Sequence, residues 1–234
     1  GDTSLDSSLS LEPLGFFNAN VNGAVSTGGT YQMGTSNGET LSGDGTVNQF
    51  FGLAGNDVLN GAGESDKLYG GDGADTLYGG AGADLLVGGA GADIFKYVAT
   101  GDGSTVTATS DLILDFNSAQ GDKIQLTSSG FGGINSLTNN TNYVEIGFAG
   151  ANLGALKAAI ADGTIDGIAD DNIADNTDYI GFLTFTDNDT NDGNSSAKFL
   201  FYDDDNAGAN GVTILADMNL TTAGSISTTD FTFV

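Results

Sequence analysis

Aspartates recur at nine-residue intervals in the first half of the chain. They are Asp57, Asp66, Asp75, Asp84 and Asp93, and Asn48 holds the same position one interval earlier. Each is the sixth residue of a Gly-rich nonapeptide, and six such copies run in tandem from Gly43 to Lys96. Stacked copies place the carboxylates in columns along two turn edges, where like charges repel unless a cation lies between them. The spacing therefore predicts a row of cation sites.

The available donors indicate which cation suits these sites. The chain has no Cys and no His, the residues that favour zinc and copper. Carboxylates and the carbonyls of Gly-rich turns supply only oxygen, which a hard divalent ion prefers. Calcium tolerates irregular geometry with six or more oxygens, whereas magnesium needs a tighter octahedron. We therefore predict several calcium ions as cofactors.

Each nonapeptide divides into six turn residues and three strand residues. Gly is frequent where the backbone must take positive φ or approach a neighbour closely, and the middle strand residue is apolar. A three-residue strand does not persist alone, so the copies must stack, with two copies forming one coil. Copies two apart then lie above one another. This arrangement predicts one inner row of Leu41, Leu59, Leu77 and Phe95, and a second row of Phe50, Leu68 and Leu86.

The last three copies read GGDGADTLY, GGAGADLLV and GGAGADIFK, which resembles the calcium-binding nonapeptide of the RTX family. The resemblance implies a parallel β-roll with calcium between the turns of successive coils. It also implies ligands from the sixth-position side chains and from carbonyls of the first four turn positions. The side-chain ligands are then Asp57, Asp66, Asp75, Asp84 and Asp93. The implied backbone ligands are Gly52, Ala54, Gly61, Gly63, Gly70, Gly71, Asp72, Gly73, Gly79, Gly80, Ala81, Gly82, Gly88, Gly89 and Gly91.

Some copies depart from this pattern. The first has Thr46 at the fourth position and Asn48 at the sixth, and the third has Glu64 where Gly is expected. A weaker seventh copy, GTSNGETLS, lies upstream in the same register. Beyond Lys96 the period stops. Asp102 and Asp111 are candidates to close a last calcium site, and a solvated turn is the alternative.

The net charge is −26, from 31 acidic and five basic residues. It argues against nucleic acid and anionic membranes as partners, and it opposes folding until cations bind. If each site has a dissociation constant of ~10⁻⁴ M, millimolar calcium adds about 1.4 kcal/mol per site, and roughly four sites add about 6 kcal/mol. Because domains are stable by only about 5 to 15 kcal/mol, the metal decides whether the roll forms.

The chain beyond the repeats is expected to be β-rich with one short helix. Alternation predicts strands in 111–116 and 123–126, and later in GFLTFT, KFLFY and VTILADM, of which the last two pair. Apolar spacing predicts a helix over 151–161. The acidic loops at 187–193 and 203–210 are interpreted as turns, with weak calcium binding as the alternative.

Two later segments carry further resemblances. The run DLILDF followed by GDKI is similar to the capping region of serralysin-type secreted proteases and other RTX proteins. The final STTDFTFV resembles a C-terminal signal for type I secretion, and a terminal strand is the alternative. The chain is thus expected to be all-β, with an irregular or β segment at 1–40, a β-roll at 41–98, and a β cap with a secretion signal at 99–234.

Composition also bounds the function. Without His or Cys there is no Ser-His-Asp triad, no HExxH zinc site and no Cys nucleophile, so we expect no catalytic residues. No apolar run reaches the length of a membrane span, so no membrane insertion is expected. Stacking would leave apolar ladders on the outer faces, which need cover. They are Phe51, Tyr69 and Val87 with Leu85 on one sheet, and Val58, Ile94 and Tyr78 on the other.

We therefore expect a secreted calcium-binding protein, exported by type I secretion machinery, that folds outside the cell. Its expected role is structural, through self-association or contact with cell-surface components, as in an S-layer, adhesin or filament. Two alternatives stay open. One is the C-terminal folding and secretion module of a larger RTX exoenzyme, and the other is a polysaccharide-binding module.

Overall fold

The computed structural model describes residues 31–103, 110–137, 143–149, 179–186, 196–203, 212–218 and 226–234. In the repeat region lie β1 (Tyr31–Met33), β2 (Thr40–Ser42), β3 (Gln49–Ala54), β4 (Val58–Gly63), β5 (Lys67–Asp72), β6 (Thr76–Ala81), β7 (Leu85–Ala90) and β8 (Ile94–Tyr97). They are followed by η2 (Thr100–Asp102), β9 (Asp111–Ile113), β10 (Lys123–Leu126), η4 (Ser128–Gly130), β11 (Tyr143–Ala149), β12 (Tyr179–Thr186), β13 (Ser196–Asp203), β14 (Val212–Met218), η5 (Thr228–Asp230) and β15 (Phe231–Phe233).

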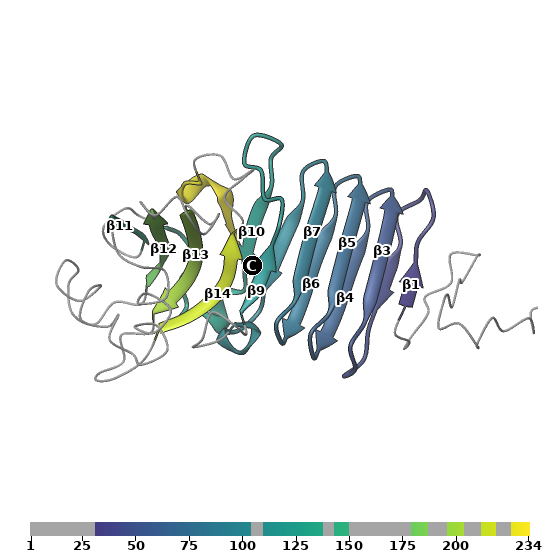
Figure 1. Cartoon of the computed structure of the whole chain (residues 1–234), viewed down its shortest axis with the longest axis horizontal. Coiled ribbons are helices and arrows are strands. Elements are labelled where there is room, and N and C mark those ends of the chain that lie inside the picture. Colours follow the sequence, from purple (N-terminus) through teal and green to yellow (C-terminus); the bar gives the residue numbers. More distant parts are fainter. Residues whose placement is uncertain are drawn as a thin grey trace, which may run out of the picture.

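The repeat strands stack into two sheets that run along the molecule (Figure 1). The chain alternates between them, so β1, β3, β5 and β7 enter one sheet while β2, β4, β6 and β8 enter the other. Neighbours in each sheet are parallel, and equivalent residues of successive coils pair, as in Phe50 with Leu68 and Leu59 with Leu77. Two nonapeptides therefore form one coil, and the predicted parallel β-roll is confirmed.

The interior of the roll is a double row of apolar side chains. Leu41 is 5% exposed, and the other six predicted inner residues are fully buried. The strands alternate because successive side chains point to opposite faces of a sheet, so one apolar residue in the middle of each strand is enough to line the core. At the N-terminal end of the described roll, Gln32 takes the inward position, and its Nε2 donates to the carbonyl oxygen of Ser42 at 2.9 Å.

Both stacks continue past the last nonapeptide. β9 pairs in parallel with β7, and β10 pairs in parallel with β8, so Ile113 and Ile124 extend the two inner rows. Of the strands predicted at 111–116 and 123–126, the first forms only over Asp111–Ile113 and the second forms in full, and they lie in different sheets. The ring of Phe116 packs against that of Phe95, with centroids 6.0 Å apart. The last coil thus keeps the geometry of the repeats without their sequence.

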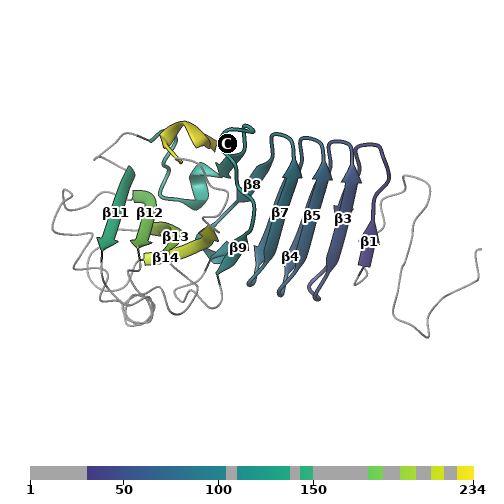
Figure 2. The ribbon, with the colours of Figure 1, turned by 45° about the horizontal axis from the view of Figure 1, so that its top comes forward.

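The later strands extend one of the two sheets (Figure 2). β12, β13 and β14 are antiparallel neighbours, β11 pairs in parallel with β12, and β14 pairs in parallel with β9. The predicted pairing of KFLFY with VTILADM is confirmed, with Phe201 opposite Ile214. The C-terminal region therefore shares a sheet with the roll.

The C-terminal residues form a strand in the other sheet. β15 pairs in parallel with β10, and the backbone of Val234 exchanges hydrogen bonds with Ser128 and Leu126. The ring of Phe231 lies 5.8 Å from that of Phe182. The helix predicted at 151–161 and the acidic loop at 187–193 lie outside the described residues, as do residues 1–30 and, beyond Asp203, the acidic loop at 203–210.

Candidate metal centre

The sixth-position aspartates form two buried columns at the turn edges. Asp57, Asp66, Asp75, Asp84 and Asp93 are each at most 2% exposed. The Oδ1 atom of each accepts the backbone N–H of the equivalent residue one coil earlier. The Asp57 N–H donates to Asp75 at 2.7 Å, and the Asp75 N–H donates to Asp93 at 2.9 Å. The second column repeats this pattern, with Asp66 donating to Asp84 at 2.7 Å. Each carboxylate therefore clamps two coils through one of its oxygens.

The other oxygen of each aspartate has no protein partner. The Oδ2 atoms of Asp57, Asp66, Asp75, Asp84 and Asp93 are all buried without a hydrogen bond. Each points at the first glycine of its own copy, and a carbonyl oxygen of the next coil also arrives at Gly52, Gly61 and Gly70. A Cβ placed on Gly52 would collide with both the Oδ2 of Asp57 and the carbonyl oxygen of Gly70. Two acceptors that face one point repel, and a cation between them satisfies both.

Burial also perturbs the pKa values of these carboxyls. Loss of solvent raises the pKa of Asp66 and of Asp93 to about 6 and that of Asp84 to about 7, and backbone hydrogen bonds only partly offset the effect. The pKa values of Asp57 and Asp75 are raised by the same cause. A bound divalent cation favours the ionised form and removes this cost.

The turns bring backbone oxygens close to the neighbouring coil. Gly73 has φ of 142°, and a Cβ there would collide with the carbonyl oxygen of Gly55 in the preceding coil. The Gly73 N–H donates to the carbonyl oxygen of Ala90 at 2.7 Å, and the Gly55 N–H donates to that of Asp72 at 2.8 Å. Third-position carbonyls such as that of Asp72 thus hold coils together, and each retains a second lone pair for another partner.

Within the described residues, no three acidic side chains converge on a point that could hold a metal ion. An ion in the roll must therefore take most of its ligands from turn carbonyls, which suits the oxygen-only preference of calcium. The donor set fits calcium because it combines a buried, unpaired carboxylate oxygen with a neighbouring turn carbonyl, as at Gly52, and supplies only oxygen. The implied carbonyl ligands remain a prediction.

Asp102 and Asp111, predicted as a closing pair, have different environments. Asp111 continues the Asp66 and Asp84 column, because its Oδ1 accepts the Asp84 N–H at 3.0 Å. Asp102 caps η2, where its Oδ2 accepts the N–H groups of Val98 at 2.6 Å and Ala99 at 3.1 Å. Burial first, then the charge of Asp84, and more weakly that of Asp102, raise the pKa of Asp111. The two carboxylates are therefore neighbours, although Asp102 is held as a turn cap.

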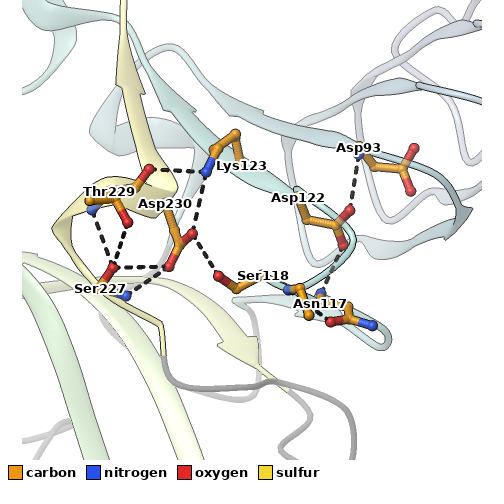
Figure 3. A network of polar contacts seen from close by, with 9 residues as sticks. Asp93, Asn117, Ser118, Asp122, Lys123, Ser227, Thr229 and Asp230 are labelled. Atoms are coloured by element: carbon orange, nitrogen blue, oxygen red, sulfur yellow. Dashed lines mark hydrogen bonds and ion pairs between the residues drawn. The ribbon is translucent and has the colours of Figure 1, made fainter.

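Two carboxylates that sequence reasoning did not select contact the last nonapeptide turn, residues 88–93. Asp122 accepts the Asp93 N–H at 3.0 Å with one oxygen and the Asn117 N–H at 2.8 Å with the other (Figure 3). Asp115 accepts the N–H groups of Gly88 at 2.9 Å and Gly89 at 2.8 Å. Both lie beyond the last nonapeptide, so the period could not reveal them. The turn residues Gly121 and Asp122 were the available signal.

The fold is a parallel β-roll whose turns hold buried carboxylate oxygens without hydrogen-bond partners. The family model of the RTX calcium-binding nonapeptide repeat (4 copies) matches residues 33–68 and 60–95. This part of the chain therefore consists of RTX repeats, whose nonapeptides bind calcium. No curated protein matches the chain.

The solved structures that match include the solution structure of the AlgE6R3 subunit from the Azotobacter vinelandii mannuronan C5-epimerase. It is 20% identical, with a TM-score of 0.40, and the match covers 91% of this chain and 81% of that chain. Within the described parts of the present chain, no helix has the length and apolar character needed to cross a membrane.

Proposed function

We propose that this chain binds calcium ions between the coils of its roll and that binding drives the roll to fold. The observation that carries the proposal is the set of buried Oδ2 atoms without partners, of which those of Asp57, Asp66 and Asp75 lie beside a carbonyl oxygen of the next coil. An unpaired buried charge is strongly destabilising, so the ionised roll needs a cation at these points. Each of the five sixth-position aspartates supplies one oxygen to an ion.

Calcium removal tests this proposal. Circular dichroism and hydrogen exchange should show an ordered protein in millimolar calcium and a largely unfolded one in excess chelator. Asp75→Asn removes a buried ligand and should reduce the number of bound ions by about one. Asp72→Asn is the matched control, because it removes the same charge from an exposed side chain of the same turn. Identical spectra with and without calcium would contradict the proposal.

We further propose that the protein is secreted and folds outside the cell. The low calcium of a cytosol leaves a chain of net charge −26 without its counterions, and millimolar calcium outside supplies them. An extended chain suits passage through a type I exporter. Pulse labelling of a secreting cell should find the exported chain folded and the intracellular chain sensitive to protease.

The proposed role is structural and non-catalytic. An apolar ladder on the outer face of the β1-β3-β5-β7 sheet supports it, with the rings of Phe51 and Tyr69 stacked 4.9 Å apart at an interplanar angle of 4° and Val87 next in register. On the other sheet, Val58 is 43% exposed. Apolar sheet faces of this kind favour contact with another chain.

Light scattering and electron microscopy, with calcium added and then chelated, test the assembly role. Large ordered assemblies that dissolve on chelation are expected. A folded product that stays monomeric at all calcium concentrations would contradict self-assembly and favour the alternative, a folding and secretion module of a larger exoenzyme.

A further inference from the structure

The first turn of the six tandem copies, residues 43–48, ends in an amide where the later turns end in a carboxylate. The Asn48 side chain is fully buried. Its Nδ2 atom makes a short hydrogen bond to the carbonyl oxygen of Thr46 in the same turn. It also lies 3.3 Å from the carbonyl oxygen of Gly61 in the next coil and 3.5 Å from that of Asp44. One donor group therefore faces three carbonyl oxygens.

This amide occupies the place that the unpaired Oδ2 occupies in later copies. A Cβ placed on Gly43 would collide with Nδ2 of Asn48 and with the carbonyl oxygen of Gly61. In the next copy the equivalent Cβ, on Gly52, would collide with Oδ2 of Asp57 and the carbonyl oxygen of Gly70. The first and sixth positions meet in the same way in both turns, although Leu53 and Gly55 have positive φ and the equivalent Asp44 and Thr46 do not. At the meeting point the side-chain atom differs. It is a donor at Asn48 and an acceptor at Asp57.

We propose that the Asn48 amide takes the place of a calcium ion in this turn, so that the turn closes without metal and limits the ion-binding stack at its N-terminal side. The inference rests on the proposed calcium binding, and it assigns ions to some turns and not to others. The amide N–H groups satisfy the carbonyls directly. The Oδ1 of Asn48 is buried without a partner, but the neutral side chain leaves no buried charge to neutralise.

The turn at residues 43–48 is also stabilised by hydrogen bonds within itself. The backbone N–H and the hydroxyl of Thr46 both donate to Oδ1 of Asp44, at 3.1 Å and 2.6 Å. This Asx-type turn holds the backbone where later copies depend on Gly. Asn48 also joins the clamp to the next coil, because its N–H donates to Oδ1 of Asp66 at 2.6 Å.

The neighbouring upstream turn, residues 34–39, is likewise satisfied by protein groups. Glu39 stands at the sixth position, and its two oxygens accept the N–H of Thr35 at 2.9 Å and its hydroxyl at 2.5 Å. At the opposite end, Asp122 has a backbone donor for each oxygen. Side chains with hydrogen-bonded oxygens thus stand at both ends of the column of Asp57, Asp75 and Asp93, whereas the column of Asp66 and Asp84 continues to Asp111, whose Oδ2 is buried without a partner.

Counting bound ions tests the assignment. Native mass spectrometry and calorimetry should give Asn48→Asp about one calcium ion more than the wild type, because the substitution recreates the acceptor of the later turns. Asn37→Asp is the matched control, since it adds the same charge on an exposed side chain of the preceding turn. Its ion count should equal that of the wild type.

Asn48→Ala should leave the ion count unchanged while lowering stability, because it removes donors and no ligand. An Asn48→Asp protein that folds in calcium without gaining an ion overturns the proposal, and so does an Asn48→Ala protein that loses one. A wild type that binds no calcium would instead defeat the proposed function.

A measurement without variants covers the case in which the substitutions prevent folding. In the calcium-loaded wild type, NMR should show slow solvent exchange of the Asn48 side-chain NH₂ relative to that of exposed Asn37. Equal exchange rates for the two side chains would overturn the proposal.

Discussion

At Asp75, folding removes both carboxylate oxygens from water and provides a protein partner for only one. Oδ1 accepts the N–H of Asp57 at 2.7 Å, and Oδ2 is buried without a partner. The backbone hydrogen bond recovers part of the lost hydration, whereas an unpaired buried oxygen of a charged group costs free energy. The same imbalance recurs at the other sixth-position aspartates. Each residue therefore favours either a proton or a metal ion.

In the absence of calcium, the stability of the roll should fall as the pH rises from about 4 to about 7. Burial raises the folded-state pKa of Asp66 and Asp93 to about 6 and of Asp84 to about 7, above the ordinary value of 3.8. The folded state then binds more protons than the unfolded state within this window, so raising the pH favours unfolding. Circular dichroism in calcium-stripped buffers measures the profile.

Repulsion among the many carboxylates also lowers stability as the pH rises. A matched pair of variants therefore separates the contribution of the buried carboxyl of Asp84 from that general effect. Asp84→Asn should flatten the profile near pH 7, whereas the exposed Asp72→Asn should not. A wild-type profile that rises with pH between 4 and 7 would show that these carboxyls are not buried as described.

A second residue-scale effect concerns backbone conformation. Ala62 stands at the second turn position with φ of 80°, where the later copies have glycines such as Gly80 with φ of 96°. A left-handed conformation costs a non-glycine residue roughly 1 kcal/mol. Ala62→Gly should therefore raise the free energy of unfolding in calcium by up to about 1 kcal/mol, measured by urea titration. Destabilisation by this substitution would mean that φ is negative at this position.

At the scale of elements, the turns form a stack that needs a different ending at each side. Inside the stack, the sixth-position N–H of each coil donates a hydrogen bond to the aspartate of the next coil, as from Asp57 to Asp75. The last described coil has no further coil beside it. There, Asp122 accepts a hydrogen bond from the N–H of Asn117, and Asp115 accepts hydrogen bonds from the N–H groups of Gly88 and Gly89. Backbone donors thus meet both oxygens of Asp115 and of Asp122 at this boundary.

Asp122→Asn should weaken the boundary without removing an ion. An amide keeps one acceptor and places its NH₂ group against one of the two backbone donors, so a loss of about 1 to 3 kcal/mol is expected. Calcium stoichiometry should stay at the wild-type value, in contrast to Asp75→Asn. A lower ion count in Asp122→Asn would make Asp122 a ligand and contradict its role as a hydrogen-bonded end.

At the scale of the whole molecule, the C-terminal region and the roll share both sheets. β14 joins β9 in one sheet and β15 joins β10 in the other. Asp230 anchors the second junction. It accepts the Ser118 hydroxyl at 2.8 Å and pairs with Lys123 at 3.4 Å (Figure 3). The last residues of the chain therefore contribute to closing the end of the roll.

Phe231→Ala should therefore destabilise the calcium-loaded roll. The side chain is 7% exposed and packs against Phe182, so its removal should cost about 3 kcal/mol or more. Thermal unfolding followed by circular dichroism measures the loss. Phe233→Ala, in the same strand and only partly buried, should cost less. Equal stability of Phe231→Ala and the wild type would show that β15 is not part of the folded unit.

Much of the roll could be predicted because its contacts repeat at one sequence separation. The period places Leu59 against Leu77 and Asp57 against Asp75, and the structure has these pairs in register. The short strands beyond the repeats were also predictable from alternation, as for β13 and β14. The secretion signal and the surface role remain proposals, because neither follows from contacts within the chain.

The sequence by itself determined the roll, its inner rows and the columns of aspartates, because a strict repeat places equivalent residues of neighbouring coils in contact. Only the tertiary structure decided how the columns end and which side-chain atoms lack partners. Asp122 meets Asp93 across a non-repeating segment, and Asp230 meets Ser118 across 112 residues. No period encodes such contacts, since they depend on how non-repeating segments of the chain fold back onto the last coil.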